Sequence, residues 1–122
     1  MVTVPFVGVV DDDDALCLSL VDLMRSIGYR AEPFSSAEEL LMSADRFGLD
    51  CIIADVHMPG MGGLNLLRKL REQGLVTPVI LITALPDENL DEEAASIGAL
   101  CLLRKAFKTG ALLDWVERAL LP

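Results

Sequence analysis

The sequence predicts an α/β domain built around a parallel β-sheet. Short apolar runs without polar alternation recur along the 122 residues, and such runs are typical of parallel strands that are covered on both faces. Between them lie segments whose apolar residues recur at helical spacing. Strands that alternate with helices favour right-handed crossovers between parallel strands. Because five strand–helix pairs follow one another without a linker, we expect a single domain over residues 1–122.

The five expected strands coincide with the apolar runs. Four of these runs are uninterrupted and indicate strands buried on both faces. The second is weaker, because Pro33 favours an edge strand or the end of a strand. The expected strands cover residues 5–10, 29–34, 51–56, 78–83 and 99–103.

A helix is expected after each strand. Gly28 ends the first helix, and Ser36 with Glu39 forms a capping-box pattern at the start of the second. The third helix follows the glycine-rich loop HMPGMGG and ends near Gly74. The fourth lies in the acidic segment LPDENLDEEAASIG, and Thr109 is the expected cap of the last.

Composition narrows the class of protein. Hydrophobic residues make up 52% of the chain and charged residues 24%, which excludes an intrinsically disordered chain. The net charge of -9 disfavours direct contact with nucleic acid or with an anionic membrane, because phosphates are repelled. No run approaches the roughly 18 apolar residues of a membrane span, and the N-terminal segment lacks a signal-peptide pattern. We therefore expect a cytoplasmic protein.

The cysteines agree with a reducing compartment. Cys17, Cys51 and Cys101 are widely spaced and form no C-x-x-C motif. Since three thiols cannot pair completely within one chain, we expect them to be buried and reduced.

Polar side chains follow four of the expected strands where each one ends, and these ends meet at one edge of a parallel sheet. They are Asp11 and Asp12, Asp55, Thr83, which precedes Ala84, and Arg104 and Lys105. Three converging carboxylates repel one another unless a cation lies between them. Oxygen ligands favour Mg²⁺ or Mn²⁺ over zinc. The hydroxyl and the lysine indicate that the cation carries an anion such as a phosphoryl group, with one carboxylate as the nucleophile.

Four motifs, in this order, resemble the receiver domain of two-component response regulators: VVDDDD, ADVHMPGMGG, ITA and LLRKAF. The resemblance covers essentially the whole chain and implies a flavodoxin-like (βα)5 fold with strand order 2-1-3-4-5. It also implies a phosphorelay switch rather than a turnover enzyme, with a sensor histidine kinase as partner. The wider sequence is most similar to receivers found with LuxR-type output domains, which implies a role in transcription regulation. Homodimerisation through the last helix is a further expectation.

The resemblance assigns roles to individual residues. Asp55 matches the phosphoacceptor, and Asp11 and Asp12 match the acidic pair that binds Mg²⁺ together with it. The backbone carbonyl of His57 matches a further metal ligand. The residues that match the phosphate-binding positions are Thr83 as the switch hydroxyl, Ala84 as a backbone donor and Lys105 as the pairing lysine.

The neighbours of these residues have simpler expected roles. Asp13 and Asp14 lie where the first helix starts, and a helix N-terminus favours negative charge by roughly 0.3–1 kcal/mol. The side chain of His57, the only histidine, is expected to line the entrance of the site without binding the metal.

Two positions depart from the family pattern. Ala106 follows Lys105 where the family usually has a cis-proline, and a cis bond to a non-proline residue costs about 3–4 kcal/mol. We therefore expect a trans bond and a shifted loop, which leaves the reach of Lys105 open. Leu102 stands where the family usually has Tyr or Phe, so the switch read-out is expected to be weak or differently built.

Three other functions compete with this interpretation. Leu102 and Ala106 favour a receiver-like interaction module with impaired switching, although the acids, Thr83 and Lys105 argue against it. An aspartyl phosphatase typically needs a second acid two residues after the nucleophile, where this chain has His57. A flavin site needs a phosphate loop, which the acidic first turn would oppose.

Overall fold

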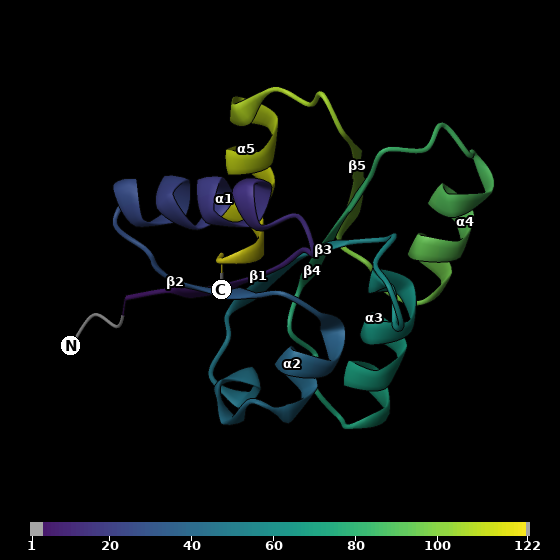
Figure 1. The fold of residues 1–122 in the computed structure, drawn as a ribbon, viewed down its shortest axis with the longest axis horizontal. Helices are drawn as coiled ribbons and strands as arrows, with labels where there is room; N and C mark the ends of the chain where they lie inside the picture. Colours follow the sequence, from purple (N-terminus) through teal and green to yellow (C-terminus); the bar gives the residue numbers. More distant parts are fainter. Residues whose placement is uncertain (1–3, 122) are drawn as a thin grey trace.

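Five short apolar runs form one parallel sheet in the computed structural model, which describes residues 4–121. The strand order is β2-β1-β3-β4-β5 (Figure 1), so the expected order is confirmed. Met1–Thr3 and Pro122 lie outside the described residues. The strands are β1 (Phe6–Val10), β2 (Arg30–Phe34), β3 (Cys51–Asp55), β4 (Val79–Thr83) and β5 (Cys101–Arg104).

The burial of each strand follows its place in the sheet. Every residue of β1, β3 and β4 is buried, whereas the edge strands β2 and β5 are partly exposed. Pro33 lies in edge strand β2 opposite Val9, as its missing N–H requires. β5 begins at Cys101 rather than at residue 99, because the backbone of Ala99 still bonds to the carbonyl of Ala94 in the preceding helix.

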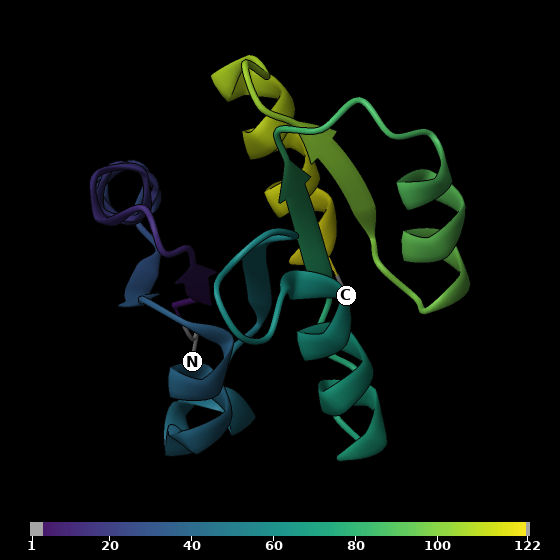
Figure 2. The same ribbon diagram turned by 45° about the vertical axis from the view of Figure 1, so that its right-hand side comes forward.

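Helices cover both faces of the sheet (Figures 1 and 2). α1 and α5 contribute to one apolar cluster, and α2, α3 and α4 contribute to the other, on the opposite face. None of the helices described between residues 4 and 121 is long and apolar enough to span a bilayer. The helices are α1 (Asp14–Ser26), α2 (Ala37–Met42), α3 (Gly63–Glu72), α4 (Asn89–Ser96) and α5 (Thr109–Ala119), with a short 3-10 turn at Ala44–Phe47.

The caps of α1 and α2 largely follow the local sequence pattern. The Asp13 side chain caps α1 by accepting from the N–H of Leu16, as expected. Ser36 caps α2, although the Glu39 carboxylate accepts from Ser35 instead of closing the expected box.

The expectation that Thr109 caps α5 is wrong. Lys108 occupies the cap position and provides no side-chain bond. Its carbonyl already accepts from the N–H groups of Ala111 and Leu112, so Thr109 is the first helical residue.

The cysteines are free thiols. Cys17 and Cys51 are buried as expected, but Cys101 is only partly buried because it lies on edge strand β5. Burial raises the pKa of Cys51 to about 12 and that of Cys101 to about 11, so both stay protonated and unreactive at neutral pH.

Two glycines let α3 approach the end of β3. A Cβ on Gly62 would lie 2.3 Å from the carbonyl oxygen of Val56, and one on Gly63 would lie 2.5 Å from that of Asp55. Real Cβ atoms do not approach a carbonyl so closely, so any larger residue must displace the backbone. The glycines therefore hold the β3–α3 connection against Asp55.

We predict that Gly63→Ala destabilises the domain by about 1–3 kcal/mol, because the added methyl group displaces the backbone beside Asp55. Denaturant unfolding measures this change. Gly110→Ala is the matched control, since its Cβ would meet nothing within 4 Å. It lies in a helix and should stabilise the domain by up to about 1 kcal/mol. Equal stabilities for the two variants would contradict the close approach at Gly63.

Candidate functional site

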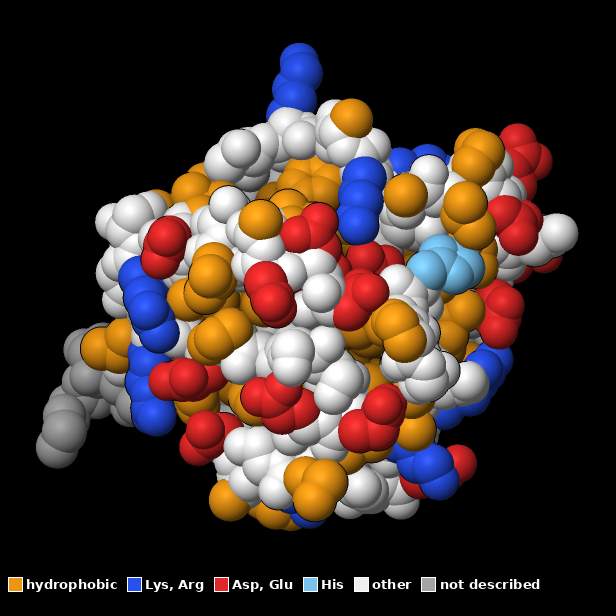
Figure 3. Space-filling model, in the orientation of Figure 1, with side chains coloured by type: hydrophobic (Ala, Val, Ile, Leu, Met, Phe, Trp, Pro, Cys, Tyr) orange, Lys and Arg blue, Asp and Glu red, His pale blue; other side chains and the backbone are white. Residues whose placement is uncertain are grey.

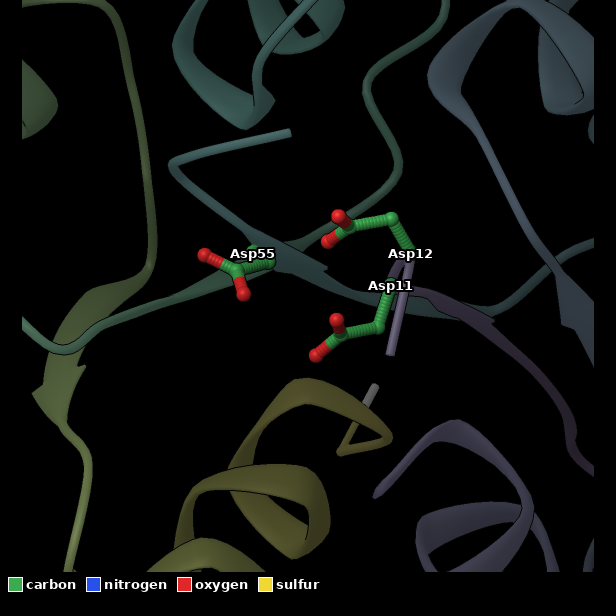
Figure 4. Close-up of side chains that lie close together, drawn as sticks. All are labelled: Asp11, Asp12 and Asp55. Atoms are coloured by element: carbon green, nitrogen blue, oxygen red, sulfur yellow. The ribbon is translucent and has the colours of Figure 1, made fainter. Parts of the chain in front are cut away.

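Three carboxylates meet at the carboxyl ends of β1 and β3. Asp11 and Asp12 directly follow β1, and Asp55 is the last residue of β3. These strands are neighbours in the sheet, and one ligand oxygen from each side chain lies within 4.8 Å of the others (Figure 4). Acidic side chains also gather on this face of the molecule in Figure 3. The convergence expected from the sequence is therefore confirmed.

Hydrogen bonds orient the two buried carboxylates. Asp11 and Asp55 are only 2% and 4% exposed, whereas Asp12 is exposed. Asp11 Oδ1 accepts from the N–H of Asp13 at 2.9 Å, and Asp55 Oδ1 accepts from the N–H of His57 at 2.9 Å. Asp55 Oδ2 accepts from the Lys105 ammonium, also at 2.9 Å. Both oxygens of Asp55 are thus held in fixed directions.

The charges of the site are only partly balanced. Burial raises the pKa of Asp11 above its ordinary value, and the nearby charges of Asp55 and Asp12 act in the same direction. The hydrogen bond to Asp55 raises the pKa of Lys105 and keeps the ammonium charged. One ammonium cannot neutralise three carboxylates, so the pocket has an excess of negative charge. Its oxygen donors fit a hard divalent cation.

Thr83 and Ala84 lie at the end of the adjacent strand. β3 and β4 are paired up to Asp55 and Ile82, so Thr83 follows immediately in the register. The Thr83 side chain is fully buried, and its hydroxyl oxygen accepts from the N–H of Leu85 at 3.1 Å. Ala84 is exposed at the start of the following loop. The Thr83 carbonyl accepts from the backbone N–H of Lys105 at 2.7 Å. This bond ties the end of β4 to the residue that follows β5.

His57 contacts the site through its backbone. Its N–H binds Asp55, while its side chain is exposed. That the imidazole lines the entrance of the site stays a prediction.

The two positions that depart from the family pattern have clear local structures. Within residues 4–121 every peptide bond is trans, as expected for Ala106. Ala106 has a left-handed backbone with φ 71°, and Lys105 nevertheless reaches Asp55. Leu102 is partly buried and packs against the cluster that contains Leu90 of α4. An aliphatic core contact thus occupies the position where the family has a ring.

Two residues to which the sequence assigned no role, Glu38 and Arg104, support the loops around the site. Glu38 of α2 accepts from the N–H of Met61 at 3.1 Å and holds the β3–α3 loop. The Arg104 guanidinium, at the end of β5, binds the carboxylate of Asp91 in α4 at 2.7 Å and the carbonyl of Asp87 at 3.2 Å. No local pattern marks these pairs, because the partners lie 13 to 23 residues apart in the sequence.

The site thus combines a parallel (βα)5 sheet with an acidic cluster and a lysine at its carboxyl edge. Residues 7–117 match the response regulator receiver domain family. The chain belongs to this family.

Two curated response regulators and one solved structure are similar to nearly the whole of this chain. The response regulator protein TmoT of Ectopseudomonas mendocina is 39% identical over 92% of this chain and 51% of its own length. The transcriptional regulatory protein FixJ of Azorhizobium caulinodans is 38% identical over 93% of this chain and 54% of its own length. The chain therefore spans about half the length of these relatives. The response regulator TrrA of Thermotoga maritima, solved in complex with Mg²⁺-BeF, matches with a TM-score of 0.83 and 25% identity over 94% of this chain and 98% of its own.

We predict that Mg²⁺ stabilises the domain, because a divalent cation relieves the repulsion among the three carboxylates. At ten times its Kd, Mg²⁺ should add about 1.4 kcal/mol to the free energy of unfolding. Thermal unfolding with Mg²⁺ and with EDTA measures the gain. Asp11→Asn should abolish the gain. Asp14→Asn is the control and should keep it, because Asp14 lies in the first turn of α1 and is not one of the three clustered acids. A wild-type protein indifferent to Mg²⁺ would contradict the metal site.

In EDTA, Asp11→Asn should be more stable than the wild type by on the order of 1 kcal/mol, because it removes a charge beside two others. The advantage should depend on pH. Since the pKa of Asp11 is raised in the folded protein, protonation favours folding, and the advantage should shrink as the pH falls through that raised value. Urea unfolding of both proteins at neutral and at acidic pH measures the difference. An advantage that stays constant over this range would contradict the assignment to Asp11.

Proposed function

We propose that this domain is the phosphorylation-dependent switch of a two-component phosphorelay. A sensor histidine kinase transfers a phosphoryl group to the carboxylate of Asp55. The contact that carries the proposal is the 2.9 Å bond between the Lys105 ammonium and Asp55 Oδ2, made beside two further carboxylates. A structural ion pair would not need Asp11 and Asp12 next to it.

The residues have complementary tasks in the transfer. An oxygen of Asp55 attacks the phosphorus while the bond from phosphorus to the kinase histidine breaks. Lys105 then pairs with a phosphoryl oxygen, and the Thr83 hydroxyl and the Ala84 N–H donate to the others. Asp11, Asp12, Asp55 and the His57 carbonyl would hold Mg²⁺. When bound, the cation offsets the negative charge on the transferring group.

The switch acts through a change in population. The Thr83 hydroxyl oxygen now accepts from Leu85 at the start of the β4–α4 loop. When the hydroxyl donates to the phosphoryl group instead, the contacts of this loop change. Phosphorylation shifts the equilibrium only as far as its interactions differ between the two conformations. The domain is a signalling switch that loses its phosphoryl group by slow hydrolysis, not a turnover enzyme.

The output of this switch is the regulation of transcription in the cytoplasm. FixJ, named a transcriptional regulatory protein, supports this proposal by its 38% identity, and the chain spans about half of that relative. The net charge of -9 argues that this domain itself does not contact DNA. Dimerisation through α5 stays a prediction.

The second candidate is a receiver-like interaction module with impaired switching. Leu102 favours it, because a leucine already packed against the core under α4 has no ring or hydroxyl to rearrange. The bond between Lys105 and Asp55 argues for a working phosphoacceptor.

We predict that acetyl phosphate with Mg²⁺ adds one phosphoryl group, detected as a single adduct in the intact mass. Asp55→Asn should show no adduct, because it lacks the nucleophile. Lys105→Ala should slow the reaction by about 100-fold, since it removes a charge aimed at the transferring group. EDTA should prevent the reaction.

Lys69→Ala is a matched control for Lys105→Ala, because Lys69 forms an exposed ion pair with Glu72 on the surface of α3. It should react like the wild type. A folded wild-type protein without any adduct would favour the interaction module over the switch.

We also predict that His57→Ala shortens the lifetime of the phosphorylated protein. The exposed imidazole follows Asp55 by two residues, and its loss opens a path for water to the acyl phosphate. The change should be about two- to tenfold, or up to ~1.4 kcal/mol in activation free energy. The loss of the adduct with time measures it, and Mg²⁺ affinity should not change, because only the backbone carbonyl of His57 would hold the metal. Equal hydrolysis rates would show that the side chain has no such role.

A further inference from the structure

We propose that Ala106 is a positioning residue whose left-handed backbone directs Lys105 at Asp55. The inference rests on the proposed function, since it concerns the group that pairs with the phosphoryl oxygen. Within the described chain, residues 4–121, Ala106 is the one non-glycine residue with positive φ, at 71°. An L-residue in this region is strained, because its Cβ approaches the following carbonyl oxygen. Such strain persists only where the surrounding structure holds it in place.

The residues on either side of Ala106 are anchored in different directions. Lys105 continues the sheet by donating its N–H to the Thr83 carbonyl at 2.7 Å, and its ammonium reaches Asp55 at 2.9 Å. Phe107 instead packs against the apolar cluster on the face of the sheet that α1 and α5 cover. The chain must make this change of direction between Arg104, which ends β5, and Thr109, which starts α5. A positive φ at Ala106 accomplishes the turn.

The Ala106 side chain itself contributes little to packing. It is exposed, although Leu16 and Phe107 line the same shallow apolar pocket beside it. Its backbone conformation, rather than contacts of its methyl group, therefore connects the two anchors. Substitutions should act according to how well each residue tolerates a positive φ, and not according to size or polarity.

The test compares residues with opposite backbone preferences, and two of them, Asn and Val, are similar in size. Asn tolerates the left-handed region, and Gly enters it freely, whereas a β-branched residue is a genuine outlier there. Ala106→Asn and Ala106→Gly should be phosphorylated by acetyl phosphate within about twofold of the wild-type rate, and Ala106→Val should be slower by about tenfold or more, toward the rate of Lys105→Met. In the Lys105→Met background, Ala106→Val should have no further effect, because it acts through Lys105.

A second measurement separates this role from general destabilisation and from the chemistry. Limited labelling of amines, read by peptide mass spectrometry, reports whether the Lys105 ammonium is still held by Asp55. Ala106→Val should raise the labelling of Lys105 several-fold, while Lys108 is unchanged. Thermal unfolding checks that each variant is folded, and Ala106→Thr, also β-branched, replaces Ala106→Val if that variant is not.

The outcomes distinguish the role of Ala106 from the proposed function of the domain. Equal phosphorylation and equal Lys105 labelling in the Asn and Val variants would overturn the role of Ala106. Slower phosphorylation of Ala106→Val in the Lys105→Met background would also overturn it, because Ala106 would then act by another route. If the folded wild type takes no phosphoryl group at all, the proposed function fails, and the Lys105 labelling still decides whether Ala106 positions the lysine.

Discussion

The ion pair between Lys105 and Asp55 is the contact on which the carboxyl edge of this sheet depends. Asp55 is almost fully buried beside Asp11, in a place where a carboxylate without partners would be costly. The ammonium at 2.9 Å offsets part of that cost, and backbone N–H groups donate to Asp55 Oδ1 and to Asp11 Oδ1. What remains is an excess of negative charge that a divalent cation can balance. The balance of charges thus makes the burial of Asp55 tolerable and favours the binding of a divalent cation.

The sheet topology makes this pair possible. β1 and β3 are neighbours, which brings Asp11 and Asp12 to Asp55. β4 lies between β3 and β5, and Lys105 directly follows β5. The lysine must therefore reach across the end of β4, close to Thr83. Its backbone bond to the Thr83 carbonyl holds it there. Thr83 and Lys105, which we propose as switch hydroxyl and phosphate-pairing lysine, thus lie together at one strand end.

The same strand ends connect the site to α4. The Thr83 hydroxyl bonds to Leu85, and Arg104 reaches from β5 to Asp87 and Asp91. The two Arg104 contacts are exposed, so each contributes modestly. Together, the contacts of Thr83 and Arg104 connect the strand ends beside Asp55 to α4 and to the loop before it. Leu102 is packed against the core and has no ring that could rotate. The connection between the strand ends and α4 therefore consists of polar contacts.

The sequence by itself determined the strands, the helices and the residues at the strand ends, because apolar periodicity and capping residues act over a few neighbouring positions. It also placed Asp11, Asp12 and Asp55 together, since parallel strands end at one edge. It missed the cap of α5 and the short 3-10 turn, where backbone hydrogen bonds outweighed side-chain preference. The reach of Lys105, the turn at Ala106 and the contacts of Glu38 and Arg104 were decided only by the tertiary structure. Each joins segments that are anchored far apart in the chain, and no local pattern encodes a distance between them.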